Sequence, residues 1–349
     1  MKKVNICTLT GNENYGNKLQ HYALQTVIEK MGFKVDSTLF IYDNYFKYVI
    51  KNLLKRLLKK VYPTRYIKFK KFDSNIKYSN NVYYRNKLHG REKYDYYVVG
   101  SDQVWNTTFP SFNLMYLLKN INEGKKISYA ASFGIDYIKK EYLNDFSSEL
   151  KKFNHISVRE DSGVEIINKL DDSIETCVLI DPTLLLTGEV WSSLAEKPKI
   201  LKHKKYILNY FLGELSEEKK EQIELIAKKE NCLIINLLEK NDPFYFSGPS
   251  EFLWLEKNAF LICTDSFHSS VFGLLFNRPF VVFDREDKEE KMNSRLDTLL
   301  NKFNLKNRRY NGKKLTKENL NHDYSEAYKI LEKERKKSKE FLENALDIK

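Results

Sequence analysis

The chain has 349 residues, 42% of them hydrophobic and 30% charged, so it is long enough for two domains and too apolar for global disorder. Its formal net charge is +12 at pH 7. No run of about 18 or more apolar residues occurs, and the apolar part of the N-terminus is too short for a signal peptide, so neither a transmembrane helix nor a leader is expected.

The four cysteines lie far apart in apolar segments and show no metal-ligand spacing; they are Cys7, Cys177, Cys232 and Cys263. This pattern predicts buried free thiols in a reducing compartment. Clustered carboxylates and a Walker-type loop are also missing from the sequence. We therefore expect a cytoplasmic protein that needs neither a metal nor a cofactor.

The chain opens with a βαβ pattern, a strand at 4–9, a helix at 18–31 and a strand at 34–40. The turn at 10–17 is rich in glycine and asparagine but lacks the GxGxxG fingerprint, so no dinucleotide site is expected. Hydrogen-bonding side chains gather there, and we interpret them as ligand-binding candidates rather than as a plain loop. They are Asn14, Tyr15, Asn17 and Gln20.

Residues 44–72 contain no acid but many Lys and Arg residues, and their apolar residues recur at helical spacing. This pattern predicts a basic amphipathic insertion. A core-packed helix with a solvated basic face and a helix docked on an anionic membrane are both open interpretations. No recognised nucleic-acid-binding motif accompanies the charge, so we expect no nucleic-acid partner.

Polar residues follow the next predicted strands, at the strand ends where ligands bind in open α/β sheets. Ser101, Asp102 and Gln103 follow the strand at 96–99. Asp102 is placed to act as a base or to accept a hydrogen bond from a sugar hydroxyl. A helix N-cap is an equally good interpretation of this residue. Arg159 follows the strand at 155–158. Further elements of this half are strands at 126–131 and 176–180 and a helix at 141–153.

A second βα series follows a connection at 188–204. It predicts strands at 206–212, 232–237, 260–263 and 280–283, with helices at 216–230, 250–257, 293–303 and a long polar helical region at 318–347. His268 and Arg285 lie near two of these strand ends, with a helix N-terminus between them, which outlines an anion site. A histidine in the first turn of a helix is also commonly solvated or structural.

Six motifs occur in order along the chain: Asn14-Tyr-Gly-Asn-Lys-Leu-Gln-His-Tyr-Ala-Leu-Gln25, Val99-Gly-Ser-Asp-Gln-Val-Trp-Asn106, Ser128-Tyr-Ala-Ala-Ser-Phe-Gly134, Ser157-Val-Arg-Glu-Asp-Ser162, Leu179-Ile-Asp-Pro-Thr183 and Asp265-Ser-Phe-His-Ser-Ser270. Each motif alone is weak, but the ordered set resembles the polysaccharide pyruvyl transferase family. The resemblance covers roughly residues 4–303.

The resemblance implies an α/β fold with two Rossmann-like β/α domains facing a cleft, similar to GT-B glycosyltransferases. We place the N-terminal, acceptor-side domain at 1–187, including the insertion at 44–72, and the donor-side domain at 205–320, followed by a helical region at 321–349. The implied donor is phosphoenolpyruvate. The implied acceptor is a sugar of a cell-surface polysaccharide or of its lipid-linked precursor, reached in the cytoplasm or at the inner face of the membrane.

The resemblance also implies the site residues. Arg159 matches the arginine of the family's Ser-x-Arg motif and His268 matches its histidine, and we add Asp102 as the third catalytic candidate. The family's Tyr-Asp-Pro-Lys pattern is broken at Phe283-Asp284-Arg285-Glu286, where Arg285 stands as the substitute cation and Arg295 as the reserve. The remaining substrate-binding candidates are Ser101, Gln103, Ser266 and Ser269, together with the four residues of the first turn.

Two rival functions remain open. A GT-B glycosyltransferase with a nucleotide-sugar donor has the same fold, because fold does not determine function. A non-enzymatic module that binds glycans or anionic membranes through residues 45–71 is the second rival.

Overall fold

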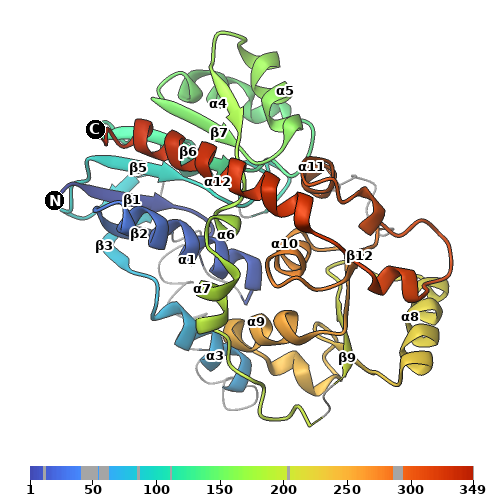
Figure 1. Ribbon diagram of the computed structural model, residues 1–349. Coiled ribbons are helices and arrows are strands. Elements are labelled where there is room, and N and C mark those ends of the chain that lie inside the picture. The colour runs from blue at the N-terminus through green and yellow to red at the C-terminus, as the bar shows by residue number, and fades with distance from the viewer. Residues whose placement is uncertain are drawn as a thin grey trace. The chain divides into compact units, whose positions relative to one another are not determined.

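The computed structural model describes residues 1–10, 13–40, 54, 63–84, 87–110, 112–202, 205–285 and 294–348. The chain divides into two compact units (Figure 1). Unit 1 comprises Met1–Leu185 and Glu334–Lys349, and unit 2 comprises Leu186–Lys333. Each unit is built on its own sheet, so the predicted α/β class with two Rossmann-like units is confirmed.

Unit 1 contains an eight-stranded sheet with the order β4-β3-β2-β1-β5-β6-β7-β8. Neighbouring strands run parallel except β3 and β4, which are antiparallel. The strand order reverses between β1 and β5, so this is the topological switch point, where ligands bind in open α/β sheets. The strands are β1 (Lys3–Cys7), β2 (Lys34–Phe40), β3 (Tyr78–Tyr84), β4 (Lys87–His89), β5 (Tyr96–Val99), β6 (Lys125–Ala131), β7 (His155–Val158) and β8 (Thr176–Val178).

Helices pack on both faces of this sheet because its central strands are apolar on both sides. On one face, Leu24 and Ile28 of α1 (Tyr15–Lys30) and Leu342 of α12 (Ser325–Ala345) share a core with alternate residues of β1, β5 and β6. On the other face, Phe146 of α4 (Leu143–Leu150) and Ile167 of α5 (Asp161–Leu170) pack in a second core. Unit 1 also contains α3 (Pro63–Asp73), η1 (Leu114–Leu117), η2 (Lys140–Tyr142) and α6 (Pro182–Leu185).

Unit 2 contains a four-stranded parallel sheet with the order β10-β9-β11-β12. Its order reverses between β9 and β11, which defines a second switch point. The strands are β9 (Tyr206–Tyr210), β10 (Leu233–Asn236), β11 (Leu261–Thr264) and β12 (Phe280–Val282). The helices are α7 (Gly188–Ser193), α8 (Glu217–Glu230), η3 (Pro243–Phe246), α9 (Pro249–Asn258), α10 (Phe267–Leu275), α11 (Ser294–Lys302), η4 (Lys306–Arg308) and η5 (Lys317–Leu320), and α12 begins here.

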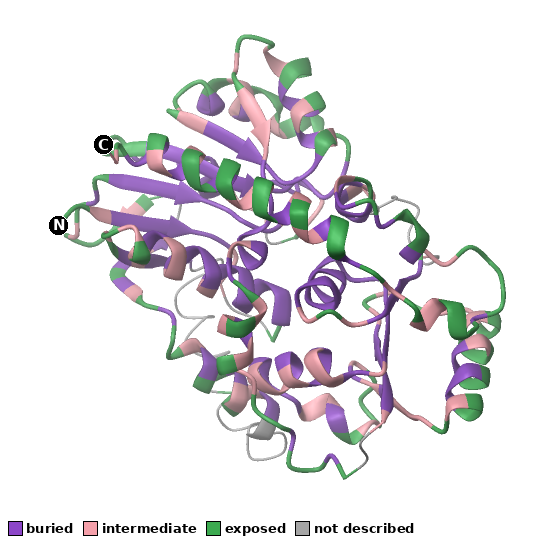
Figure 2. Cartoon of the chain, in the orientation of Figure 1, coloured by how far each residue is buried: buried purple, intermediate pink, exposed green. Residues whose placement is uncertain are grey.

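Helix α10 is buried along its whole length, as Figure 2 shows. Its Phe272 ring lies edge-on to Trp191 of α7 and to Phe252 of α9, with ring centroids 5.3 and 5.8 Å apart. The residues of α10 after its first turn are apolar or glycine, and the helix is covered by its neighbours. Its first turn, with His268, Ser269 and Ser270, lies at the end of β11.

The observed elements differ from the predicted ones mainly as follows. Strands β3 and β4 were not predicted, because Tyr78–Tyr84 is too polar to show an apolar period. Helix α1 begins three residues before the predicted start, since Asn14 caps it. The connection at 188–204 contains α7, and residues 334–349 of the expected C-terminal region belong to unit 1.

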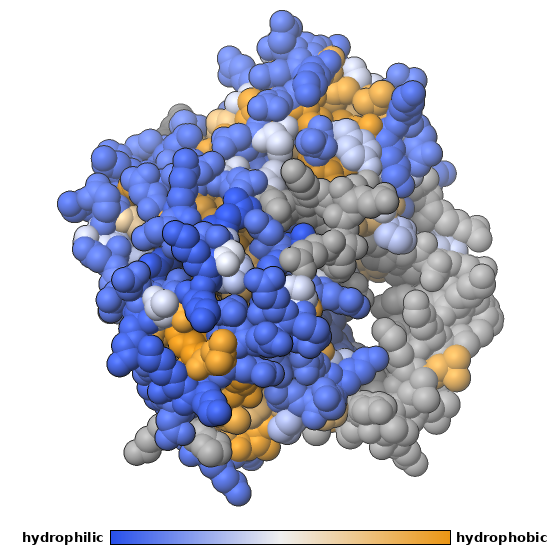
Figure 3. Space-filling model, turned by 90° about the vertical axis from the view of Figure 1, so that its right-hand side faces the viewer, coloured by the Kyte–Doolittle hydropathy of each residue, from blue (hydrophilic) through white to orange (hydrophobic). Residues whose placement is uncertain are grey.

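Most of the predicted basic insertion at 44–72 lies outside the described residues. Its described end forms α3, in which Arg65, Phe69 and Phe72 are buried while Ile67 is 57% exposed. Within the described residues, no helix is long and apolar enough to cross a bilayer. Figure 3 shows one face of the molecule, on which the coloured surface is mostly hydrophilic with small hydrophobic patches.

Candidate functional site

The first turn of α1 is fixed from two sides. Asn14 caps the helix by accepting a 3.0 Å hydrogen bond from the Asn17 N–H. Tyr15 is fully buried, and its hydroxyl accepts a 2.9 Å bond from Nη1 of Arg65, whose guanidinium also lies over the Tyr15 ring. The Tyr15 side chain is therefore packed inside the protein, whereas the Asn17 side chain faces the end of β5.

The turn after β5 is tied to β1 and α1 at the switch point of unit 1. The Ser101 N–H donates to Oε1 of Gln20 at 3.1 Å, and Thr8 Oγ1 donates to the Ser101 carbonyl at 3.1 Å. Gln20 Nε2 in turn donates to Thr8 Oγ1 at 3.0 Å. Two predicted ligand-binding residues, Ser101 and Gln20, thus use these groups to hold the turn, and Thr8 was missed because it is a short polar residue at the end of an apolar strand.

Asp102 comes next in this turn and is 7% exposed. It adopts a left-handed backbone conformation, with φ of 65°. One carboxylate oxygen, Oδ2, accepts a 3.3 Å bond from Asn17 Nδ2. The other, Oδ1, accepts from the Gln103 N–H at 2.9 Å and from Nη2 of Arg159 at 3.4 Å. The predicted catalytic residues Asp102 and Arg159 are therefore in direct contact.

Arg159 is a buried cation among acids. Its Nη1 donates to Oδ2 of Asp181 at 2.7 Å, and its Nε lies 4.0 Å from Oε2 of Glu160. The side chain is 1% exposed. Burial acts to lower the pKa of Arg159, but the three neighbouring carboxylates outweigh burial and raise the pKa above its ordinary value.

Asp181 uses both carboxylate oxygens in this network. Besides Arg159, its Oδ2 accepts a 2.9 Å bond from Ser101 Oγ. Its Oδ1 accepts from the N–H and the hydroxyl of Thr183 at 2.9 and 2.7 Å. The sequence motif at 179–183 includes Asp181 without predicting a role for it, although an acid directly after a strand was a usable signal.

Glu160 anchors the loop after β6. Its Oε1 accepts from the hydroxyl of Ser132 and from the N–H groups of Phe133 and Gly134, at 3.0, 2.7 and 3.0 Å. Gly134 has φ of 68°, and a Cβ there would lie 2.0 Å from Oε1 of Gln103. Gln103 is thus packed against this loop. This packing explains the position of Gln103, and no bound ligand is needed to explain it.

In unit 2, the residue after β11 binds the loop after β9 across the second switch point. Asp265 accepts hydrogen bonds from the N–H groups of Leu212 and Gly213 at 2.7 and 2.8 Å. Its Oδ2 also accepts from Nε of Arg285 at 2.9 Å. Arg285 is therefore oriented by Asp265, a residue that entered the sequence analysis only as the first residue of the motif at 265–270.

His268 lies in the first turn of α10 and is 7% exposed. The hydroxyl of Ser269 donates to Oε1 of the buried Glu256 at 2.6 Å, and the Ser266 carbonyl accepts from Ser270 Oγ at 2.9 Å. Complete burial raises the pKa of Glu256 well above its ordinary value, despite the bond from Ser269. The structure thus turns Ser269 toward α9 and leaves the roles of His268 and Ser266 as predictions.

Arg295 lies in the first turn of α11 and is 7% exposed. The preceding residues 286–293 lie outside the described part of the chain. Its role as the reserve cation stays a prediction.

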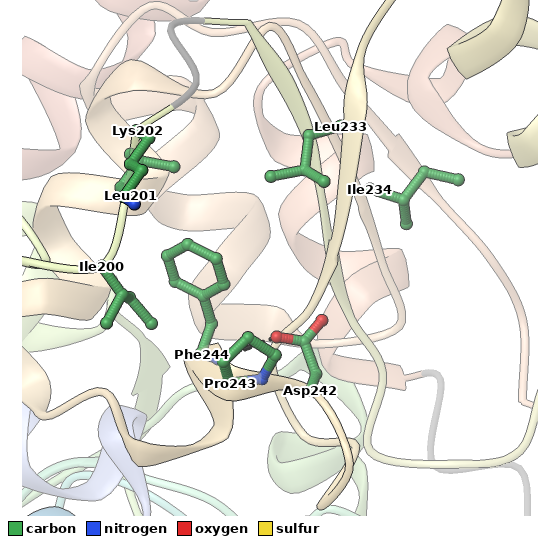
Figure 4. A pocket seen from close by; sticks show the side chains of 8 residues that line it. All are labelled: Ile200, Leu201, Lys202, Leu233, Ile234, Asp242, Pro243 and Phe244. Carbon is green, nitrogen blue, oxygen red and sulfur yellow. Dashed lines mark hydrogen bonds between the residues drawn. The ribbon is translucent and has the colours of Figure 1, made fainter.

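A hollow in unit 2 has a volume of about 220 Å³ and lies beside the edge strand β10 (Figure 4). None of the predicted site residues lines it. Its lining is mostly apolar and comprises Ile200, Leu201, Lys202, Leu233, Ile234, Asp242, Pro243 and Phe244. In the described part of the chain, no three His, Cys, Asp or Glu side chains form a group suited to a metal ion.

Solved structures similar in fold include a putative UDP-N-acetylglucosamine 2-epimerase from Listeria monocytogenes, with 12% identity, a TM-score of 0.49 and coverage of 98% of this chain and 91% of that one. UDP-GlcNAc 2-epimerase from Methanocaldococcus jannaschii is 14% identical, with a TM-score of 0.46 and coverage of 95% and 98%. The N-terminal domain of Candida albicans trehalose-6-phosphate phosphatase is 9% identical, with a TM-score of 0.49 and coverage of 99% and 96%. Nothing about substrate or reaction follows from likenesses this distant.

Comparison with curated proteins gives no match. The family model described as polysaccharide pyruvyl transferase, in contrast, matches residues 14–287. This stretch spans both groups of side chains, from the first turn of α1 to Arg285. The chain therefore belongs to the polysaccharide pyruvyl transferase family.

Proposed function

We propose that this protein transfers the enolpyruvyl group of phosphoenolpyruvate to a sugar of a cell-surface polysaccharide or of its lipid-linked precursor. The products are a pyruvate ketal and phosphate. The observation that carries the proposal is the family match over residues 14–287, which includes both switch-point groups. Membership of the family supports a transferase that acts on polysaccharide, and the donor and the ketal chemistry are our proposal.

The charges around Arg159 support a neutral acceptor rather than an anionic donor in unit 1. Three carboxylates surround this single guanidinium, at 2.7, 3.4 and 4.0 Å. Phosphoenolpyruvate carries a carboxylate and a phosphate, and a net negative cluster repels both. Asp102 is instead suited to accept a proton from a sugar hydroxyl. We therefore propose that Arg159, a catalytic candidate from the resemblance, holds Asp102 rather than binding phosphoenolpyruvate.

Unit 2 offers the cations that the donor needs. Arg285 is fixed through Nε, and its Nη1 has no protein acceptor within the described residues, so that nitrogen is available to a phosphate or a carboxylate. His268 at the start of α10 suits proton transfer or phosphate binding, because an imidazole ring can both donate and accept protons and hydrogen bonds. The N-terminus of α10 adds a favourable field for an anion.

The reaction balances with these groups. A proton adds to C3 of the enol, which becomes a methyl group, and C2 acquires oxocarbenium character. One sugar hydroxyl attacks C2 and gives its proton to Asp102, and the C2–O bond to phosphate breaks. A second hydroxyl then closes the ring and loses its proton. Of the two hydroxyl protons, one replaces the proton used at C3 and the other leaves with phosphate.

The test is phosphate release from phosphoenolpyruvate with a panel of p-nitrophenyl hexopyranosides that have free 4- and 6-hydroxyls. Mass spectrometry should show a product heavier than the acceptor by one pyruvate less one water. Arg285→Ala and His268→Ala should each lower turnover by about 10²–10³-fold, the usual cost of losing one charge contact in the transition state.

Arg309→Ala is the matched control, because this arginine is already bound by Asp284 and Asp297. Its turnover should stay near that of the wild type. Thermal stabilisation by UDP- or GDP-sugars, with no phosphate released, would instead favour the glycosyltransferase. Binding to anionic liposomes that Lys55, Arg56, Lys59 and Lys60 to Glu abolishes, with no turnover, would favour the membrane-binding module.

A further inference from the structure

Asp181 and Asp102 share one cation, and they share it unequally. Arg159 donates to Asp181 through Nη1 at 2.7 Å and to Asp102 through Nη2 at 3.4 Å. We propose that Asp181 is a positioning residue, which draws Arg159 away from Asp102 and thereby keeps Asp102 a strong enough base to accept the sugar proton. This inference rests on the proposed function, in which Asp102 is that base.

Within the described residues, three charged side chains contact Asp102 or share its cation, and they come from three segments. Arg159 lies at the end of β7, Asp181 directly before α6, and Glu160 directly before α5. Helix α1 contributes the neutral amide of Asn17. Close pairing with a cation makes a carboxylate a weaker base, and a nearby like charge makes it a stronger one.

Removing the charge at Asp181 should make Asp102 a weaker base in two ways. Asp102 would no longer be repelled by a second carboxylate, and Arg159 would be left to pair with it more closely. Asp102 would then hold its proton less tightly. Asp181→Asn is nearly isosteric, so it removes the charge while an oxygen remains for the bonds from Thr183.

Removing the Ser101 hydroxyl should change the proton affinity of Asp102 in the opposite direction. Its Oγ lies 2.9 Å from Oδ2 of Asp181, the oxygen that also accepts from Arg159, and 3.1 Å from the Ala130 carbonyl. Without this hydroxyl, Oδ2 has one donor fewer and should bind Arg159 more tightly. Asp102 in Ser101→Ala should therefore hold its proton more tightly than in the wild type.

The experiment follows the titration of Asp102 by NMR in full-length protein labelled with [γ-13C]aspartate. The Asp102 resonance is assigned as the signal missing from Asp102→Asn. We expect its midpoint to move down by about one pH unit in Asp181→Asn and up by a few tenths in Ser101→Ala, within the range that single charge partners produce. Thr183→Val is the matched control, because it loosens Asp181 and leaves its charge in place.

Kinetics with varied phosphoenolpyruvate at a saturating acceptor concentration complete the test. In Asp181→Asn, kcat should fall roughly three- to tenfold, as for a weaker base, while KM for phosphoenolpyruvate stays within about twofold.

An unmoved Asp102 midpoint in Asp181→Asn, or an equal downward shift in Thr183→Val, overturns the inference. If Asp181→Asn does not fold, a Ser101→Ala midpoint that is unchanged or lower overturns it as well. A wild-type enzyme without turnover, in contrast, overturns the proposed function, and the NMR shift then reports the shared cation alone.

Discussion

Arg159 shows why a single residue can be located from sequence while its chemistry cannot. Its place at a strand end follows from the strand-like stretch at 155–158. Its partners Asp181 and Asp102, however, are 22 and 57 residues away along the chain. Only the sheet order brings these three side chains together, and their distances decide whether the arginine faces a ligand or is neutralised within the protein.

At Asp102, the expected result is a loss of chemistry without a loss of donor binding. Asp102→Asn should lower phosphate release by about 10²–10⁴-fold, because an amide is not a general base. Isothermal titration calorimetry should show that phosphoenolpyruvate still binds as it does to the wild type.

In the same titration, Arg285→Ala should bind phosphoenolpyruvate more weakly than the wild type does. An Asp102→Asn variant that no longer binds phosphoenolpyruvate would contradict the assignment of the donor to unit 2.

The contact between α1 and β2 contains a histidine that titrates far from its ordinary range. His21 is 1% exposed and lies 2.6 Å from Ser37 Oγ. Burial, with a smaller contribution from Lys18, lowers the pKa of His21 to about 3. Since the unfolded chain binds a proton near pH 6.5 and the folded chain does not, the stabilisation is present above pH 6.5 and is lost as pH falls toward 3.

His21→Gln removes this titration. Wild-type protein should lose about 2 kcal/mol of unfolding free energy between pH 7.5 and pH 5 through His21 alone, at about 1.36 kcal/mol per pH unit below 6.5. Urea unfolding at both pH values measures this loss. The difference in unfolding free energy between wild type and variant should be smaller at pH 5 than at pH 7.5. A difference that is the same at both pH values would show that His21 is not buried in its neutral form.

The exit from β5 depends on a glycine. Gly100 has φ of 114°, and a Cβ there would lie 2.2 Å from the Tyr129 carbonyl oxygen of β6. Gly100→Ala should therefore destabilise the protein by roughly 3 kcal/mol or more in urea unfolding, since backbone of a paired strand cannot move aside.

Gly32→Ala separates conformational strain from the clash. Gly32 has φ of 91°, but a Cβ there would have no neighbouring atom within 4 Å, so a cost of about 1 kcal/mol is expected. Equal effects of the two substitutions would mean that contact with β6 does not restrict Gly100.

At the scale of the whole molecule, most of the order of α and β elements, apart from β3 and β4, followed from sequence because apolar periodicity is a local property. The strand at 34–40 and the strand at 155–158 have the predicted bounds. What sequence could not provide is how distant segments are assigned to units. The return of Glu334–Lys349 to unit 1 depends on Leu342, Ala345 and Leu346 packing against strands more than two hundred residues earlier.

This return predicts that α12 stabilises unit 1 in particular. Leu342→Asp would place a charge in a fully buried position, at a cost of several kcal/mol. Hydrogen exchange should become faster in peptides from β1, β5 and β6 and stay slow in peptides from β9 and β11. Lys336→Asp, at an 80% exposed position of the same helix, should change neither set, and faster exchange throughout both units in Leu342→Asp would refute the selective effect.

The insertion of Leu186–Lys333 within unit 1 also determines the order in which the protein is completed on the ribosome. The eight strands of unit 1 are synthesised first, and the part of α12 that covers one of their faces is synthesised after all of unit 2. At ordinary rates of translation this delay lasts on the order of ten seconds. During that interval Tyr129 and its apolar neighbours lack the cover that Phe341 and Leu342 of α12 later provide, so we expect the nascent chain to bind a chaperone that recognises hydrophobic segments.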